Sequence, residues 1–170
     1  MTRSELNADF LVGLPHDAAV LEVGCGNGLQ LRCLHDMGFT NLYGVDVNAE
    51  LLAECPGYVL ATEASADDLP FSDAMFELVF TSGLLMHIAP DSLDKTMREI
   101  VRVSNRWVWG FEYYAPKSEE VEWRGHRGIL WRDDHSRLYE KLGLRLAKIR
   151  YLPHITDGSK VDVMFLLEKR

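Results

Sequence analysis

A glycine-rich segment at residues 20–29, Val-Leu-Glu-Val-Gly-Cys-Gly-Asn-Gly-Leu, constrains the fold of this chain more than any other stretch. Residues 20–23 have strand character. After the glycines, Leu31, Leu34 and Met37 recur at helical spacing until Gly38. Glycine lets a backbone turn sharply and approach a ligand that a side chain would push away. A strand, a glycine turn and a helix N-terminus together form a nucleotide-binding corner, so we expect a doubly wound α/β sheet.

The spacing of these glycines separates two kinds of nucleotide site. A dinucleotide fingerprint reads Gly-x-Gly-x-x-Gly, whereas this chain reads Gly-x-Gly-x-Gly and carries Leu29 in place of the third glycine of that fingerprint. Asp46 follows a predicted strand at 41–45, where its carboxylate could accept hydrogen bonds from two ribose hydroxyls. An NAD-type oxidoreductase remains a second interpretation, and a turn in some other α/β protein a third.

Length and charge limit the classes of partner. A chain of 170 residues fits one domain, 1–170, and its net charge of −8 disfavours binding to a phosphate backbone. Three cysteines without paired spacing read as free thiols in a reducing compartment. The chain shows no signal peptide and no apolar run of membrane-spanning length. We therefore expect a cytoplasmic protein, monomer or homodimer, that binds neither nucleic acid nor membrane.

Strands alternate with helix-length segments, which favours a parallel sheet. We expect an amphipathic helix at 4–14 capped by Ser4, and a helix capped by Asp91 or Ser92. Residues 115–135 show no clear periodicity and are expected to form a functional loop. The remaining expected elements are strands at 58–62, 76–80 and 106–111, a helix at 135–142, and two closing strands at 144–151 and 161–167 joined by a turn around Asp157-Gly158.

Four motifs in this order resemble the Rossmann-like (class I) methyltransferases that use S-adenosylmethionine (SAM). They are Glu22-Val-Gly-Cys-Gly-Asn-Gly28, Gly44-Val-Asp46, Asp68-Leu-Pro-Phe71 and Phe76-Glu-Leu-Val79. The resemblance implies a mostly parallel seven-stranded sheet with an antiparallel C-terminal strand. It also implies SAM as cofactor, with S-adenosylhomocysteine (SAH) as the product.

The same resemblance implies a set of cofactor-binding residues. The glycine motif lies against the methionine part of SAM, Asp46 holds the ribose, and the loop before Leu-Pro-Phe contacts the adenine. The aspartate usual in that loop falls here on Ser65, which leaves the Ala66 N–H as an adenine contact. The full expected set is Glu22, Gly24, Cys25, Gly26, Asn27, Gly28, Asp46, Val47, Ser65, Ala66, Asp67 and Thr81.

The second half of the chain resembles the methyltransferases associated with pseudaminic acid biosynthesis. The resemblance rests on His87-Ile-Ala-Pro-Asp91, Arg98-Glu99, Ser104-Asn-Arg106, Glu112-Tyr-Tyr-Ala-Pro116, Trp123-Arg-Gly-His126 and Trp131-Arg-Asp133. It implies a small polar acceptor, possibly a sugar or nucleotide sugar, methylated on oxygen or nitrogen. The N-terminal segment that such proteins place before the glycine motif looks abbreviated here, so we expect a shortened lid.

Methyl transfer needs an acceptor held in line with the methyl group and, for a hydroxyl acceptor, a base. His87, Glu112 and Tyr113 follow strand ends and are the expected catalytic residues; His87, Tyr114, Arg124 and His126 are expected to bind the acceptor. Each has a plainer interpretation. His87 could be a loop histidine bonded to backbone, Glu112 and the tyrosines could fill the core, and the arginine could be solvated.

The histidines and cysteines lack the spacing of a metal site, so we expect no metal.

Two other functions stay open for this chain. A non-catalytic SAM-binding or partner protein is one alternative, because Ser65 departs from the family pattern. An NAD-dependent oxidoreductase is the other.

Overall fold

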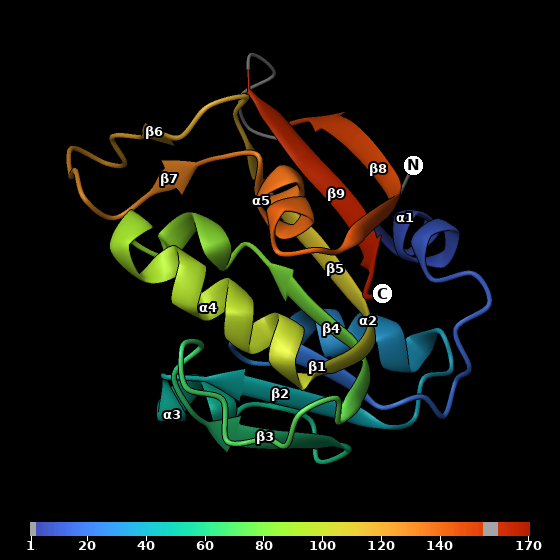
Figure 1. Ribbon diagram of the computed structural model, residues 1–170. Helices are drawn as coiled ribbons and strands as arrows, with labels where there is room; N and C mark the ends of the chain where they lie inside the picture. The colour runs from blue at the N-terminus through green and yellow to red at the C-terminus, as the bar shows by residue number, and fades with distance from the viewer. Residues whose placement is uncertain (1–2, 155–159) are drawn as a thin grey trace.

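The computed structural model describes residues 3–154 and 160–170 and contains a seven-stranded sheet covered by helices on both faces (Figure 1). The strand order is β3-β2-β1-β4-β5-β9-β8, in which all pairings up to β5 are parallel and β9 runs antiparallel to both neighbours. The expected fold class, a mostly parallel Rossmann-like sheet with one antiparallel C-terminal strand, is confirmed. The strands are β1 (Val20–Val23), β2 (Leu42–Asp46), β3 (Val59–Glu63), β4 (Phe76–Ser82), β5 (Ser104–Tyr114), β8 (Arg145–Pro153) and β9 (Val161–Glu168).

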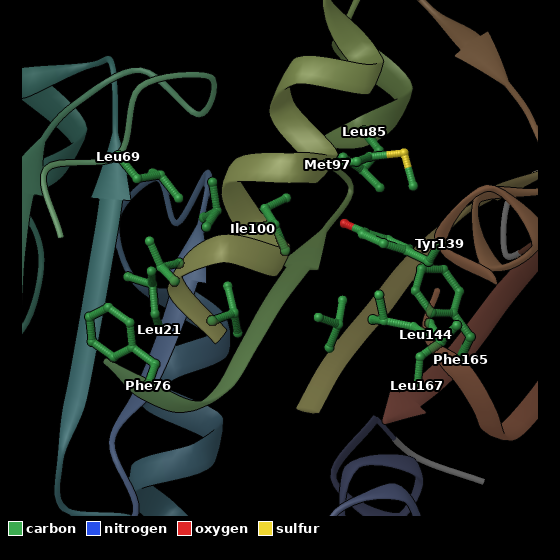
Figure 2. Packing of buried hydrophobic residues seen from close by; sticks show 14 of the residues in the cluster. Leu21, Leu69, Phe76, Leu85, Met97, Ile100, Tyr139, Leu144, Phe165 and Leu167 are labelled. Carbon is green, nitrogen blue, oxygen red and sulfur yellow. The ribbon is translucent and has the colours of Figure 1, made fainter. Parts of the chain in front are cut away.

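The helices divide the apolar core into two layers. Helices α4 (Pro90–Val103) and α5 (His135–Lys141) cover one face of the sheet, and α1 (Arg3–Phe10) and α2 (Leu29–Asp36) cover the other (Figure 1). A short helix, α3 (Ala49–Leu52), follows β2. Figure 2 shows the layer on the α4–α5 face, where Met97 and Ile100 of α4 and Tyr139 of α5 pack over the sheet. Even-numbered residues of β5 face this layer, whereas Trp109 belongs to the layer of α1 and α2.

Close contact between β5 and β9 depends on one glycine. Gly110 lies opposite Phe165 in the antiparallel pair, and a Cβ on Gly110 would come within 2.2 Å of the phenyl ring. Because Phe165 is fully buried, its ring fills the space that a side chain at position 110 would need. The antiparallel strand therefore packs tightly against the parallel part of the sheet.

Several expected boundaries are wrong. Helix α1 ends at Phe10 and includes Ser4, so Ser4 is not its cap, although Leu6, Phe10 and Leu11 are buried as expected. Helix α4 begins at Pro90 after Ala89, and neither Asp91 nor Ser92 caps it, because proline already provides the backbone angle of a first helical residue.

Strand β5 extends to Tyr114, so Glu112, Tyr113 and Tyr114 lie within the sheet, paired with β9, and not beyond it. The segment at 115–135 contains a small two-stranded ribbon, β6 (Glu119–Glu120) and β7 (Trp131–Arg132), and this arm extends away from the body in Figure 1. The expected turn around Asp157-Gly158 falls outside the described residues.

Candidate active site

The glycine turn after β1 brings backbone N–H groups close to a carboxylate of β2. Gly24, Gly26 and Gly28 have φ angles of +74°, +52° and +76°, a left-handed conformation that side chains disfavour. A Cβ on Gly24 would lie 2.7 Å from Leu84 Cδ1. The Gly26 N–H donates to Asp46 Oδ2 at 2.8 Å, which ties the turn to the end of β2.

Asp46 is fixed in place and keeps acceptor capacity. Its other oxygen, Oδ1, accepts from the Asn48 N–H at 2.9 Å, and Asn48 in turn caps α3 by accepting from Glu50 and Leu51. An ionised carboxylate offers about four lone-pair sites, of which these two backbone bonds use two. The remaining sites suit a pair of neighbouring hydroxyls, which is the group that a ribose presents.

Two cavities meet at this carboxylate. One, of about 300 Å³, lies between the ends of β2 and β3 and the start of α4; the other, of about 320 Å³, lies beside the glycine turn. Gly24 and Asp46 line both cavities, so a ligand could pass over the end of β1 from one to the other. The first is further lined by Val47, Ser65, Ala66, Asp67, Leu84, Ile88, Ala89, Ser92 and Thr96, and the second by Glu22, Cys25, Gly26, Asn27, Leu29, Gln30, Leu51 and Ser82.

The arrangement fits SAM. The α4-side cavity has apolar walls with polar backbone at one edge, as a purine base needs, and the second cavity has the glycine backbone and Ser82 around it. Glu22, buried on β1, lines the second cavity, where a carboxylate would face the ammonium group of a bound methionine. Burial raises the pKa of the Cys25 thiol, so this side chain lines the cavity as a neutral group.

A partly buried ion pair on α4 holds the loop at 69–73, the adenine-side loop, against the helix. Glu99 accepts from the Leu69 N–H at 2.9 Å, and the Arg102 guanidinium donates to the carbonyl oxygens of Leu69 (3.0 Å) and Phe71 (2.7 Å). Arg102 also binds Glu99 at 2.7 Å, and its hydrogen bond lowers the pKa of the Glu99 carboxyl. The Leu-Pro-Phe motif is thus explained by this clamp and does not itself contact the cavities.

Ser65 stands in a local network at the mouth of the α4-side cavity. Its hydroxyl donates to Asp67 Oδ1 at 2.5 Å, and Lys95 of α4 donates to Asp67 Oδ2 at 3.0 Å. These two hydrogen bonds lower the pKa of Asp67, the bond from Ser65 contributing most. The three consecutive residues expected at the adenine, Ser65 to Asp67, therefore lie together at this cavity.

Two expected cofactor residues lie elsewhere. Gly28 starts α2, and a Cβ there would approach Cys55 Sγ and Pro56 Cδ at 3.3 Å, so its close contact is with the protein. Thr81 is buried in β4 beside Glu112 and lines neither cavity. The other ten expected cofactor residues line one cavity or both.

Glu112 faces the interior. It is completely buried, and it accepts hydrogen bonds from the backbone N–H groups of Leu84 (3.2 Å) and Met86 (3.4 Å). Burial raises the pKa of Glu112 to about 7. Because side chains alternate along a strand, Glu112 points to the α5 side and not to the edge of the sheet. The structure therefore makes it an anchor for the segment after β4, which corresponds to the plainer interpretation of this residue.

The next two residues of β5, Tyr113 and Tyr114, point to opposite faces of the sheet. Tyr114 packs edge-on against Tyr151 of β8 with ring centroids 4.8 Å apart, on the same face as Glu112. Tyr113 points to the opposite face, where its hydroxyl lies 3.4 Å from Nε2 of His154. Of the two, Tyr113 shares the sheet face of Glu22 and Ser82.

His87 lies on a short 3₁₀ helix, η1 (Leu85–His87), between two residues of the α4-side cavity, Leu84 and Ile88. Its side chain is exposed, and Nδ1 lies 3.1 Å from the carbonyl oxygen of Ile129 in the arm. A carbonyl accepts only, so Nδ1 donates, and in the neutral imidazole Nε2 is left as an acceptor. The backbone-bonded interpretation of His87 is thus observed, and this tautomer still leaves one nitrogen for another partner.

Arg124 and His126 lie at the end of the arm. Trp123 and His126 exchange two backbone hydrogen bonds of 2.9 Å around Arg124-Gly125, and both turn residues have positive φ, as tight hairpin turns require. The Arg124 guanidinium lies 5.6 Å from the centre of the Trp123 ring. Neither Arg124 nor His126 lines a cofactor cavity, so the structure does not bring them to Asp46.

Sequence reasoning missed the residues that α4 brings to the site. Ala89, Ser92 and Thr96 line the α4-side cavity, and their contribution depends on how α4 crosses the sheet. Ser82 was missed although it is the last residue of β4, and the end of a predicted strand was the available signal. Within the described part of the chain, no three His, Cys, Asp or Glu side chains gather as a metal site would require, and no helix could cross a bilayer.

Comparison with known proteins gives the family of this site. The family model described as "Methyltransferase domain" matches residues 21–106. Human methyltransferase-like protein 27 is 35% identical over 80 residues, 44% of this chain and 33% of that protein. Sterol 24-C-methyltransferase erg6 of Schizosaccharomyces pombe is 26% identical over 140 residues, 71% of this chain and 36% of that protein. The matched region thus spans about a third of these curated relatives.

A solved methyltransferase structure with bound SAH shares the fold of this chain. The 1,6-didemethyltoxoflavin-N1-methyltransferase of Burkholderia thailandensis, crystallised with 1,6-didemethyltoxoflavin and SAH, superposes with a TM-score of 0.75. The match covers 97% of this chain and 76% of that one at 17% identity. Half of the chain matches the family model and nearly all of it adopts the fold, so the protein belongs to the methyltransferase domain family, the class I SAM-dependent methyltransferases.

Proposed function

We propose that this protein transfers the methyl group of SAM to an oxygen or nitrogen of a small polar acceptor. The observation that carries the proposal is the pair of cavities joined at Asp46 and Gly24, with adenine assigned to the α4 side and methionine to the glycine side. When bound, SAM supplies a methyl group on a sulfonium that leaves as a neutral thioether. The remaining task of the protein is to hold the acceptor in line, which supplies much of the rate enhancement.

The topology indicates where the acceptor would lie. Ser82, at the end of β4, lines the methionine-side cavity and is paired with Phe111 of β5. Tyr113 lies two residues beyond Phe111 on the same face, so its Cα is roughly 8 Å from that of Ser82 from ordinary strand spacings. We place the acceptor over the ends of β4 and β5, between the methionine cavity and Tyr113.

For the acceptor class we propose a sugar or nucleotide sugar of surface-glycan biosynthesis. The resemblance to the pseudaminic acid-associated methyltransferases supports it, and so does the net charge of −8, which disfavours a nucleic acid substrate. Arg124 offers a bidentate fork for a carboxylate or phosphate, and His87 offers Nε2. Arg124 lies in the arm and His87 is bonded to it, so both would contact an acceptor held between the arm and the cofactor site. We therefore assign them to acceptor binding and not to proton transfer.

A turnover assay tests the proposal. The purified protein is incubated with SAM and a panel of acceptors, namely CMP- and UDP-linked sugars, free hexosamines, phenols and primary amines, and released SAH is quantified. We expect SAH release with at least one acceptor, and slower release from an Asp46→Ala variant at SAM concentrations that just saturate the native protein. SAH binding without release from any acceptor would indicate a non-catalytic SAM-binding protein instead.

A further inference from the structure

Three polar side chains form a hydrogen-bonded row: Tyr113 of β5, Asp162 of β9 and His154, the residue after β8. Nδ1 of His154 lies 2.9 and 3.0 Å from the two carboxylate oxygens of Asp162, and Nε2 lies 3.4 Å from the Tyr113 hydroxyl. The Tyr113 and His154 rings also meet edge-on, with centroids 4.7 Å apart. Tyr113 and Asp162 are direct partners in the antiparallel pairing of β5 and β9, so the sheet itself sets this geometry.

The row has a defined direction. A carboxylate only accepts, so Nδ1 of His154 donates to Asp162, and in the neutral imidazole Nε2 carries the lone pair. The Tyr113 hydroxyl then donates to Nε2, and its own oxygen keeps lone pairs for a further donor. Burial, with the Asp162 carboxylate close by, raises the pKa of Tyr113, so its hydroxyl keeps its proton near neutral pH.

The row opens toward the proposed acceptor. Asp162 and His154 are nearly buried, with 5% and 13% of their side-chain surface exposed, whereas Tyr113 is half-buried at the edge of the sheet. Strand β5 ends, and β9 begins, at the edge that carries the glycine turn, because β9 runs antiparallel. All three side chains share the sheet face of Glu22 and Ser82, the residues of the methionine-side cavity.

Two basic side chains of β8 on this face are paired with an acidic residue of α1. Arg150 and Lys148 of β8 form ion pairs with Asp9 of α1 at 3.1 and 2.6 Å. On β5 and β9 the groups that face His154 are Tyr113 and Asp162. A positive charge gained by His154 would therefore be stabilised mainly by the Asp162 carboxylate, in the way that a buried aspartate stabilises the imidazolium of a catalytic triad.

We propose that Tyr113 and His154 take the proton from the acceptor, with Asp162 as the residue that positions the imidazole. A hydroxyl acceptor loses its proton during methyl transfer, whereas an ammonium acceptor loses it beforehand and attacks as the neutral amine. This inference rests on the proposed function. The acceptor oxygen or nitrogen forms its bond to the methyl carbon while the carbon–sulfur bond breaks, and that electron pair stays on the sulfur of SAH. The acceptor proton moves to the Tyr113 oxygen, and the Tyr113 proton moves to Nε2 of His154. The sulfonium charge is lost and the imidazolium charge is gained, so charge balances.

His87, the other imidazole near the site, is placed less well for this step. It lies between residues that line the α4-side cavity, and its Nδ1 is bonded to the arm. The proposed function assigns the methyl group to the methionine-side cavity, whose residues Glu22 and Ser82 lie on the sheet face of Tyr113. Tyr113 is therefore the catalytic residue in this proposal, and His87 contacts the acceptor only from the opposite side.

The first test needs no acceptor. Nitrogen-15 NMR of the histidine-labelled protein with SAH should show His154 with a protonated Nδ1 and an unprotonated Nε2, and Asp162→Asn should reverse this tautomer or mix it. His154 assignment comes from the resonance lost in His154→Gln. A native His154 protonated on Nε2 alone would overturn the row, because Tyr113 could then not donate to it.

The second test uses the acceptor found in the turnover panel. Tyr113→Phe and His154→Gln should each lower kcat about 100-fold, the range for loss of a general base, with the SAH dissociation constant unchanged. The double variant should be no slower than the slower single variant, because the two residues act as one unit. Tyr58→Phe and His35→Gln, a stacked pair on the far side of α2, are the matched controls and should keep native activity.

The outcomes separate this inference from the proposed function. Turnover that survives in both Tyr113→Phe and His154→Gln would overturn the proton pathway and leave the methyltransferase assignment intact. Losses in the two variants that multiply in the double variant would show independent structural effects and would also overturn it. Failure of the native protein with every acceptor would overturn the proposed function, and the catalytic role of the row with it.

Discussion

The Asp46 carboxylate lies between the glycine turn and the proposed ribose site, and one backbone hydrogen bond to each oxygen holds it there. Its two oxygens accept from the N–H groups of Gly26 and Asn48 and leave lone pairs directed at the junction of the two cavities. Asp46→Ala should weaken SAH binding by 10- to 100-fold, roughly the 1.5–3 kcal/mol of hydrogen bonds to a charged group. Calorimetric titration measures this, with Asp36→Ala at the exposed end of α2 as control. Unchanged affinity in Asp46→Ala would contradict the ribose role.

The raised pKa of Glu112 makes the stability of the protein depend on pH. Burial raises its pKa from 4.5 to about 7, so between these values the folded protein holds a proton that the unfolded chain has released. The free energy of unfolding should therefore fall as the pH rises from about 4.5 to 7, by about 3 kcal/mol for this residue. Above about pH 7 the contribution is fully lost.

Glu112→Gln isolates this effect, because an amide does not titrate. The variant should be less stable than the native protein at pH 5, where one backbone N–H of the 84–86 segment loses its acceptor. Its stability should then decline less between pH 5 and 8, as measured by urea denaturation at each pH. Parallel pH curves for the two proteins would show that Glu112 does not titrate in this range.

At the scale of elements, the Arg102 clamp positions the adenine-side loop against α4. Its guanidinium bonds two carbonyl oxygens of the loop together with Glu99 and Asp73. Arg102→Ala should lower stability by about 1–3 kcal/mol and weaken SAH binding, because two partly buried carbonyl oxygens of the loop and the Glu99 carboxylate lose their donor at once. Arg98→Ala, one turn earlier and paired at the surface with Asp94, should leave both nearly unchanged, because exposed ion pairs contribute little. Thermal denaturation measures the stability of both variants, and titration with SAH measures their affinity. Equal effects of Arg102→Ala and Arg98→Ala would show that the Arg102 clamp does not position the loop.

The junction of β5 and β9 makes a second prediction at this scale. Gly110→Ala would place a methyl group about where the Phe165 ring lies, and overpacking of this kind costs about 1–3 kcal/mol or more. Gly57→Ala, at a turn with open space around it, should cost little. Urea denaturation compares the two variants, and a native-like Gly110→Ala protein would show that β9 is free to shift.

For the whole molecule, the local sequence pattern predicts the parallel half of the sheet well. The run from Val20 to Gly28, the strand before Asp46 and the strand at 76–80 appear as expected, because short-range periodicity and glycine turns are local properties. The antiparallel last strand was expected only from family resemblance, and the sheet order confirms it. Helix ends were less predictable: Ser4 and Asp91 are good capping residues, but packing and Pro90 set the boundaries.

The candidate site likewise has a part that the local sequence predicts and a part that depends on packing. Ten of the twelve expected cofactor residues line the cavities, since they follow strand ends that a parallel sheet brings to one edge. Glu112 and Tyr113 are adjacent in sequence but face opposite sides of β5, and only the observed extent of the strand reveals which face each one takes. The partnership of Tyr113 with His154 and Asp162 joins residues 41 and 49 positions apart, which no local pattern indicates.

The central claim is that this fold binds SAM at the junction formed by Asp46, and a calorimetric titration with SAH tests it most directly. NADH serves as the control ligand, because a dinucleotide site is the rival interpretation of the glycine turn. We expect one SAH per chain, no binding of NADH, and a gain in stability of about 2.7 kcal/mol at an SAH concentration a hundred times its dissociation constant. Binding of NADH in place of SAH, or of neither ligand, would contradict the account.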